Sequence, residues 1–258
     1  MYNLKENLAS GKPIVGTWLN SGSPIVAELM AMSGFDFVCV DAEHSAVDLP
    51  QTQQIFQAIR SGSQDCAAVV RLHGVDYSFV KQYLDAGAQG VIAPLVRTKS
   101  EAKILVEATK FPPMGLRGVG FCRANNYGMQ LDKEFEEANA KTLVAIQIEH
   151  VEAVRNIDEI LEVEGIDAVF IGPYDLTASM GITGQFDHID YVKIRDKILE
   201  ACKKHKKIPG IHVVKPEPEQ VITRFGEGYQ LLAYSLDITM LTESCTAGLN
   251  KIRKGCSQ

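Results

Sequence analysis

Hydrophobic residues along this chain form eight short runs, each followed by a longer segment in which apolar residues recur with helical spacing. The short runs have the length and the valine and isoleucine content of buried strands. They are Ile14–Leu19, Phe35–Val40, Ala67–Leu72, Gly90–Ala93, Leu143–Ile148, Ala168–Ile171, Ile208–Val213 and Tyr229–Ala233. The expected helices lie near 23–33, 50–61, 76–86, 99–110, 151–163, 189–206, 216–226 and 237–252.

This alternation over 258 residues predicts a single α/β domain spanning 1–258, a (β/α)8 or TIM barrel. A doubly wound open sheet is the structural alternative. It is disfavoured because no Gly-x-Gly-x-x-Gly motif follows the first strand. No change of composition marks a boundary between domains, so one barrel is the expected architecture.

Two carboxylates lie at the carboxyl ends of neighbouring predicted strands, where a barrel carries its chemistry. Glu149 directly follows the fifth strand, and Asp175 comes four residues after the end of the sixth. Carboxylate oxygens at one edge of the sheet predict a binding site for a divalent metal, with coordination positions left open for a ligand. The alternative interpretation is that each acid only favours the start of the following helix.

Other strand ends supply a cation, a base and neutral polar groups. Arg71 ends strand three and is suited to stabilise the oxygen of an enolate, while Gln147 on strand five can donate a hydrogen bond. His44 follows strand two and is the candidate base, with Asp85 to orient it. Singly, each has a purely structural alternative. Together they predict metal-assisted enolisation of a 2-oxo acid.

The segment 111–142, between strands four and five, is glycine-rich and is the longest between predicted elements. Loops of this length are usually functional. We expect Arg123 in this segment to receive an anionic substrate group, the alternative being a solvated arginine on an ordered loop. Trp18, the only tryptophan, ends strand one and is a further candidate for substrate contact.

Charge and composition narrow the possible partners. A formal net charge of −6 without a basic block argues against nucleic-acid binding. The six cysteines show no zinc-ribbon spacing, and no window is apolar enough to cross a membrane. The N-terminus has no apolar leader segment. These features favour a cytoplasmic enzyme that acts on a small molecule.

Six motifs together resemble the HpcH/HpaI family of metal-dependent, class II pyruvate aldolases. The similarity runs from about Gly16 to Leu241, with the motifs in the family's order. They are Asp41-Ala42-Glu43-His44, Val70-Arg71, the segment from Lys81 to Gln89, Arg117-Gly118-Val119-Gly120, Gln147-Ile148-Glu149 and the segment from Phe170 to Leu176.

The resemblance implies a barrel of the phosphoenolpyruvate/pyruvate-binding type and reversible aldol cleavage of 4-hydroxy-2-oxo acids to pyruvate and an aldehyde. It implies that Glu149 and Asp175 bind Mg²⁺, Mn²⁺ or Co²⁺, that Arg71 stabilises the enolate and that Gln147 contacts pyruvate. The backbone of three further residues would line the pyruvate carboxylate: Gly172, Pro173 and Tyr174.

The resemblance also implies that His44 and Asp85 form an acid–base dyad. It implies a homo-oligomer, a trimer or hexamer, in which the C-terminal helix packs on a neighbouring subunit and Asp41 approaches an adjacent site. Three residues depart from the family's usual choice. They are Ala42 in place of Gly, His150 in place of Thr and Tyr174 in place of Ala. We expect such departures to bear on the aldehyde rather than on the reaction class, and we expect His150 only to start the following helix, the alternative being an effect on the surroundings of the metal.

Three rival functions remain compatible with the sequence. A 2-oxo acid decarboxylase, or another carbon–carbon lyase or synthase, would use the same enolate site. A Schiff-base aldolase would use Lys215, just past strand seven. The third rival function is that of a barrel which binds a 2-oxo acid without catalysis. The presence of the catalytic candidates His44, Asp85 and Arg71 argues against it, since binding alone does not need them.

Overall fold

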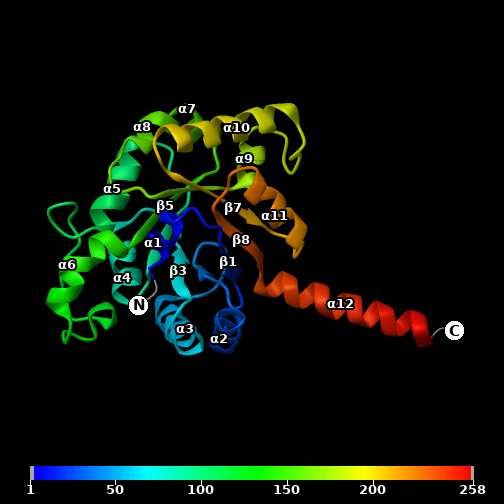
Figure 1. The fold of residues 1–258 in the computed structure, drawn as a ribbon, viewed down its shortest axis with the longest axis horizontal. Helices are drawn as coiled ribbons and strands as arrows, with labels where there is room; N and C mark the ends of the chain where they lie inside the picture. The colour runs from blue at the N-terminus through cyan, green and yellow to red at the C-terminus, as the bar shows by residue number, and fades with distance from the viewer. Residues whose placement is uncertain (1–2, 257–258) are drawn as a thin grey trace.

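The computed structural model describes residues 3–256 and has the predicted barrel. Eight parallel strands are hydrogen-bonded in chain order, and β1 also pairs with β8, which closes the sheet (Figure 1). The strands are β1 (Ile14–Leu19), β2 (Phe37–Asp41), β3 (Ala67–Arg71), β4 (Gly90–Ala93), β5 (Leu143–Ile148), β6 (Ala168–Ile171), β7 (Ile208–Val213) and β8 (Leu231–Leu236).

Helices follow the strands, and most of them cover the outside of the barrel (Figure 1). Those predicted from the sequence are α2 (Pro24–Met32), α3 (Leu49–Gly62), α4 (Tyr77–Asp85), α5 (Lys99–Thr109), α7 (Val151–Arg155), α8 (Ile157–Leu161), α10 (Ile189–Lys204), α11 (Pro218–Gly226) and α12 (Asp237–Cys256). The structure adds α1 (Leu4–Ala9), α6 (Leu131–Lys141), α9 (Pro173–Ser179) and the 3₁₀ turn η1 (Arg123–Asn125).

Several predicted elements differ in extent. β2 starts at Phe37 rather than two residues earlier, and β8 runs beyond its predicted end to Leu236. The predicted helix 151–163 is divided at Asn156, whose side-chain amide donates to the carbonyl of Arg97 instead of facing solvent. The segment 111–142 is not a loop throughout, because Leu131–Lys141 within it form α6.

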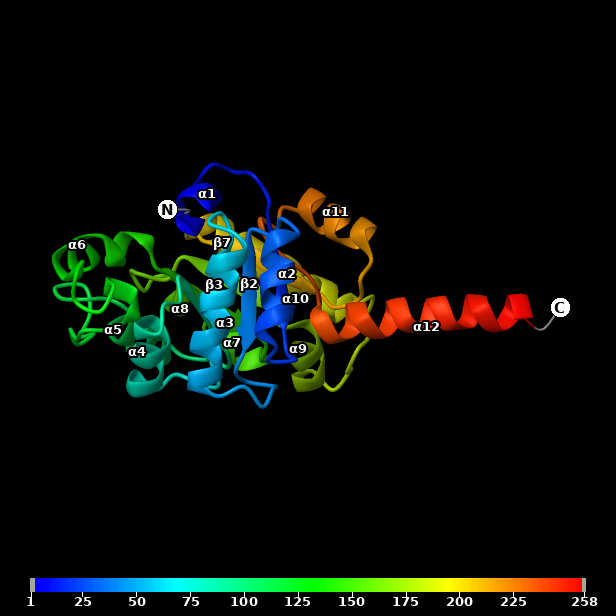
Figure 2. The ribbon, with the colours of Figure 1, turned by 90° about the horizontal axis from the view of Figure 1, so that it is seen from below.

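The barrel interior is closed at one end. Leu4 and Leu8 of α1 are buried and pack with the inward-facing residue Ile14 of β1. Figure 2 shows α1 at one end of the strands and α9 at the other, so the open end is the one where the strands finish. This is the C-terminal end, where the sequence predicts the site.

Helix α12 projects away from the body of the barrel (Figures 1 and 2). Beyond Met240 all its side chains are exposed, and the exposed apolar side chains of the helix include Ile238, Leu241, Leu249 and Ile252. Within residues 3–256, no helix has both the length and the apolar character needed to cross a bilayer.

Candidate active site

The C-terminal end of the barrel interior is lined by polar and aromatic side chains. Alternate residues of a strand face the same side of a sheet, and this alternation brings inward the side chains of Trp18, Arg71, Gln147 and His212, from the odd-numbered strands. Together with the end of β6 they surround a cavity of about 250 Å³. Below this layer the interior is filled with apolar residues.

Two acidic residues hold Arg71 in place. Its Nε and one Nη donate to the two carboxylate oxygens of Asp41 at 2.9 and 2.6 Å, and its other Nη lies 3.3 Å from Glu43 Oε2. Asn20 Nδ2 donates to Asp41 as well, at 2.7 Å. Burial alone would raise the pKa of Asp41, but the hydrogen bonds and charge of Arg71 outweigh it and lower that pKa.

Asp41 is fully buried, and within one chain its carboxylate is taken up by these contacts. Its function here is therefore to fix the plane of the guanidinium group beside the cavity. A guanidinium group has five N–H donors, so after this bidentate pairing Arg71 still has N–H donors available for a ligand.

Glu149 is a buried carboxylate that shares its site with like charges. Its oxygens accept from the backbone N–H of Leu95 at 2.7 Å and from Nε2 of Gln147. Burial raises the pKa of Glu149 to about 7, and the nearby charges of Glu43 and Asp175 add to the effect. A cation bound beside Glu149 would offset both effects and stabilise its ionised form.

Gly172 lets the chain pass close to Glu149. A Cβ at this position would lie 2.7 Å from Glu149 Oε2 and 3.0 Å from Gln147 Nε2, so a larger residue would displace both. Gly172 is also the N-cap of α9, which brings Asp175, in the first turn, to the same end of the barrel. The first N–H groups of a helix have no partner within it, so they remain available for an anion.

Unpaired polar atoms concentrate at this end of the barrel. Among the described residues, the buried side-chain atoms without a hydrogen-bond partner include Trp18 Nε1, Asn20 Oδ1 and Gln147 Oε1. Native proteins rarely leave such atoms unpaired, and a cluster of them indicates groups waiting for a ligand. This is the strongest geometric sign that the cavity binds a polar molecule.

Comparison with known proteins gives the family of this chain. The model of the family described as HpcH/HpaI aldolase/citrate lyase matches residues 15–243. The chain belongs to this family. A 4-hydroxy-2-oxo-heptane-1,7-dioate aldolase of Klebsiella pneumoniae is 37% identical, the match covering 94% of this chain and 91% of that protein. A 4-hydroxy-2-oxovalerate aldolase of Rhodococcus jostii is 36% identical over 95% of this chain and 93% of its own length.

Among solved structures, an HpcH/HpaI aldolase/citrate lyase family protein from Burkholderia cenocepacia superposes with a TM-score of 0.92. It is 33% identical, with 97% of this chain and 98% of that one covered. The predicted family and fold of this HpcH/HpaI aldolase are therefore confirmed.

Most of the site residues predicted for this HpcH/HpaI aldolase lie around the one cavity. They are Trp18, Asp41, His44, Arg71, Gln147, Gly172, Pro173, Tyr174 and Asp175, with Glu149 directly beside Gln147 and Gly172. His44 and Tyr174 lie at its rim, with 61% of the His44 side chain exposed and 50% of Tyr174. His150 is the N-cap of α7, accepting from the N–H of Glu152, as expected of a helix-initiating residue.

Asp85 does not join His44 within one chain. It ends α4, and a helix that follows a barrel strand runs back toward the N-terminal end of the strands. There its carboxylate accepts from Arg117 Nη at 2.9 Å, and the Arg117 guanidinium lies over the ring of Phe111. A dyad of His44 and Asp85 would therefore need Asp85 from a second chain.

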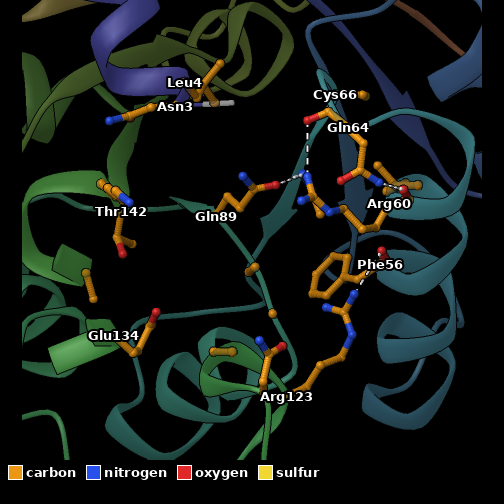
Figure 3. A pocket seen from close by; sticks show the side chains of 18 of the residues that line it. Asn3, Leu4, Phe56, Arg60, Gln64, Cys66, Gln89, Arg123, Glu134 and Thr142 are labelled. Carbon is orange, nitrogen blue, oxygen red and sulfur yellow. Dashed lines mark hydrogen bonds between the residues drawn. The ribbon is translucent and has the colours of Figure 1, made fainter. Parts of the chain in front are cut away.

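Arg123 also lies away from the predicted site. It belongs to a second cavity, of about 680 Å³, lined by residues that precede the strands, such as Cys66 and Gln89 (Figure 3). Its guanidinium donates to the carbonyl of Ala86 at 3.1 Å and is packed against Gly87. Within one chain, Arg123 is thus placed to hold η1 against α4 rather than to receive a substrate of the barrel mouth.

His212, Asn20 and Phe170 line the cavity as well, although the motifs did not select them as site residues. Strand parity could have found His212, since it lies between the buried residues Ile211 and Val213 and so faces the interior. Asn20 follows β1 directly, a position that parity within the strand does not determine.

The donor set fits a hard divalent cation. Glu149 and Asp175 offer carboxylate oxygens, which Mg²⁺ and Mn²⁺ prefer, and Glu149 is destabilised as an anion by its surroundings. In the described part of the chain, no group of three His, Cys, Asp or Glu side chains could enclose a metal ion. Two carboxylates are compatible with an open site, because Mg²⁺ commonly keeps water or substrate ligands.

Proposed function

We propose that this family member is a class II aldolase that cleaves or forms 4-hydroxy-2-oxo acids, with pyruvate and an aldehyde as the other partners. One observation carries the proposal: Arg71, held by the carboxylate of Asp41, faces the same cavity as Gln147 and Asp175, and the carboxylate of Glu149 lies directly beside Gln147. This combination is what stabilisation of an enolate requires, namely positive charge and hydrogen-bond donors at the developing oxyanion.

Glu149 and Asp175 would hold the divalent cation, with Mg²⁺, Mn²⁺ or Co²⁺ as candidates. When bound, the cation would act as a Lewis acid toward the oxygens of the 2-oxo acid. The chain itself would hold Glu149 in place through hydrogen bonds from the N–H of Leu95 and the amide of Gln147. Gly172 has no side chain, which leaves room for the Glu149 carboxylate.

The 2-oxo acid would bind between the start of α9 and Arg71. Its carboxylate would lie against the backbone of Gly172, Pro173 and Tyr174. The donor among these would be the N–H of Tyr174, in the first turn of α9, because Pro173 has no N–H and that of Gly172 donates to Ile148. Its keto oxygen would accept from Arg71 and from the amide of Gln147. Arg71 stabilises the negative charge that grows on this oxygen as a proton leaves the third carbon.

His44 is the proposed base at the rim, where the aldehyde enters. Asp85 would orient it from a neighbouring chain, which is consistent with a homo-oligomer, a trimer or hexamer. The exposed apolar side chains of α12 support the same proposal, since a helix without a partner for Leu241, Leu249 and Ile252 is suited to pack on another subunit. Sedimentation velocity would give the subunit number.

Imine chemistry has little support from the geometry. Lys215 is exposed and is not among the residues that line the cavity. A decarboxylase, or another carbon–carbon lyase or synthase, would use the same residues and therefore remains the alternative. A cytoplasmic location is also a proposal, which the six free cysteines support because thiols stay reduced there.

The test is cleavage of a 4-hydroxy-2-oxo acid, with pyruvate release followed by lactate dehydrogenase. Protein treated with EDTA should be inactive and should recover with Mg²⁺ or Mn²⁺. Asp175→Asn should lose metal affinity and turnover, whereas Asp196→Asn, an exposed acid on α10, should leave both unchanged. Activity that is insensitive to EDTA would contradict the proposal, and oxaloacetate decarboxylation faster than every aldol reaction would favour the alternative.

A further inference from the structure

Asn20 has no part in the proposed reaction, yet its side chain contacts the residue that holds Arg71. Its Nδ2 donates to Asp41 Oδ2 at 2.7 Å. The orientation of this amide follows from the chemistry of its partner, because an ionised carboxylate can only accept, so the atom that faces it must be the nitrogen. Asn20 therefore acts on Arg71 indirectly, through the position of Asp41.

The two oxygens of Asp41 are held by different parts of the chain. Apart from Arg71, Oδ1 accepts from the backbone N–H groups of Glu43 and His44, each at 3.1 Å. Among the described residues, Oδ2 has only Asn20 besides Arg71. With both oxygens anchored, the carboxylate cannot pivot. If Asn20 were lost, the carboxylate could turn about Oδ1, and the guanidinium group paired with it would turn as well.

The plane of the Arg71 guanidinium decides where its remaining N–H groups point. A guanidinium donates within its own plane and in a fixed fork, unlike the ammonium group of a lysine. In the proposed binding mode Arg71 donates to the keto oxygen of the 2-oxo acid, and this bond strengthens as negative charge develops there. A misplacement of about 1 Å at such a group costs up to about 10²-fold in rate.

Asn20 is itself held by a carboxylate from the end of the barrel. Asp237 Oδ1 accepts from the backbone N–H of Asn20 at 2.9 Å, and Oδ2 accepts from that of Ser21 at 3.0 Å. Asp237 is buried, and buried carboxylates need partners of this kind. One side chain thus fixes two consecutive residues of the segment that leaves β1.

A bulge near the end of β8 precedes Asp237. The register of β1 on β8 shifts between Gly16 and Trp18, where β1 advances by two residues and β8 by three. Ser235 in this bulge has φ of 52°, a backbone conformation that residues other than glycine rarely adopt. Asp237 follows as the first residue of α12, so its hydrogen bonds join the start of that helix to the site.

We propose that Asn20 and Asp237 are positioning residues, which act on the reaction through Asp41. Asp237 fixes the backbone of Asn20, and the Asn20 amide fixes the carboxylate of Asp41. Asp41 then sets the plane of the Arg71 guanidinium against the oxygen at which the negative charge develops. This inference rests on the proposed aldolase function, in which Arg71 stabilises the enolate.

The first experiment measures exchange of the methyl protons of pyruvate with D₂O by NMR at saturating Mg²⁺. In Asn20→Ala, kcat should fall by about tenfold, less than the roughly 10²–10³ expected for removal of Arg71 itself, while KM for pyruvate changes by no more than about twofold. Asp237→Asn keeps the shape but offers one oxygen to the two N–H groups, so it should show the same pattern to a smaller extent. This second variant decides the question if Asn20→Ala does not fold.

Affinity for oxalate provides a readout that needs no turnover. Oxalate resembles the enolate of pyruvate, because it is planar and carries negative charge on an oxygen at the keto position. In calorimetry with Mg²⁺, Asn20→Ala should bind oxalate about tenfold more weakly, in parallel with the loss of kcat. In the background of Arg71→Lys, Asn20→Ala should cause almost no further loss, because an ammonium group has no plane to fix.

The matched control is Asn139→Ala. The Asn139 side chain accepts from the N–H of Phe111 at 2.7 Å and donates to its carbonyl at 2.9 Å, but it belongs to α6 and is not among the residues that line the site cavity. Its removal should lower the free energy of unfolding, while kcat and oxalate affinity stay at the parent values. A loss of stability alone would therefore not reproduce the effect of Asn20→Ala.

A folded Asn20→Ala with the kcat of the parent would overturn the proposal. An equal loss of oxalate affinity in the parent and in the Arg71→Lys background would overturn it too, since Asn20 would then act independently of Arg71. Both results leave the aldolase function intact. A parent that neither exchanges pyruvate nor binds oxalate with Mg²⁺ would instead refute the proposed function, and this inference with it.

Discussion

Raising the pH should destabilise the metal-free protein because of Glu149. Burial holds its pKa at about 7, against an ordinary value of 4.5, so the folded protein binds this proton more tightly than the unfolded chain does. The resulting stabilisation is complete below pH 4.5 and disappears as the pH rises through 7. This sign is opposite to that of a carboxylate stabilised by an ion pair.

The difference between the two pKa values corresponds to about 3 kcal/mol at roughly 1.4 kcal/mol per unit. Most of it, about 2.5 kcal/mol, should be lost between roughly pH 5 and pH 8. Glu149 is almost fully buried, with 3% of its surface exposed, so solvent screening does not reduce this figure much.

The matched variant is Glu149→Gln, which is uncharged at every pH and has nearly the same shape. Its amide oxygen can still accept from Leu95, and a rotation of the Gln147 amide would let the unpaired Oε1 of that residue accept the new N–H. Other titrating groups are common to both proteins and cancel in the comparison.

The assay is urea denaturation in EDTA at pH 5, 6, 7 and 8. The free energy of unfolding of the parent relative to Glu149→Gln should fall by about 2.5 kcal/mol across this range. Saturating Mg²⁺ should stabilise the parent more at pH 8 than at pH 6, since cation and proton compete for Glu149. Parallel curves for parent and variant would refute the assigned pKa.

Three further variants test individual residues of the site. Arg71→Ala should lower the kcat of aldol cleavage by about 10²–10³, as for loss of one oxyanion donor, and near-parent turnover would refute its role. Gly172→Ala should cost about 1–3 kcal/mol in urea denaturation and weaken Mg²⁺ binding, because its Cβ would lie 2.7 Å from Glu149 Oε2, whereas the open position in Gly120→Ala should change neither. His44→Ala should still bind pyruvate and Mg²⁺ in calorimetry but exchange the methyl protons of pyruvate slowly; exchange at the parent rate would exclude His44 as the base.

The fold could be predicted from the sequence because its hydrophobic pattern repeats a simple unit. Element ends were less certain, since they depend on tertiary contacts: Tyr229 is apolar and buried, yet it precedes β8 and follows the turn at Gly228, which has φ of 102°. Likewise, the hydrogen bond from the Asn156 side chain to the carbonyl of Arg97 interrupts the predicted helix 151–163, although its apolar residues are spaced as in one continuous helix.

Site residues on strand ends were the most predictable. Arg71 and Gln147 end or lie within buried strands, so strand direction alone places them together. Asp85 and Arg123 required knowledge of where a helix and a loop lie in three dimensions. The end of α4 lies at the far end of the barrel, which the order of elements already indicates, whereas the path of 111–142 is set by contacts such as the one between Arg123 and Ala86.

Proton–deuterium exchange at the methyl group of pyruvate is the most direct measurement of the central claim, that this barrel generates an enolate of a 2-oxo acid. It needs no aldehyde and can be followed by NMR with EDTA-treated protein, before and after addition of Mg²⁺. The arrangement of Arg71, Gln147, Glu149 and Asp175 predicts exchange that depends on the cation and is lost in Arg71→Ala. Folded protein that gives no exchange with Mg²⁺, Mn²⁺ or Co²⁺ would contradict the account.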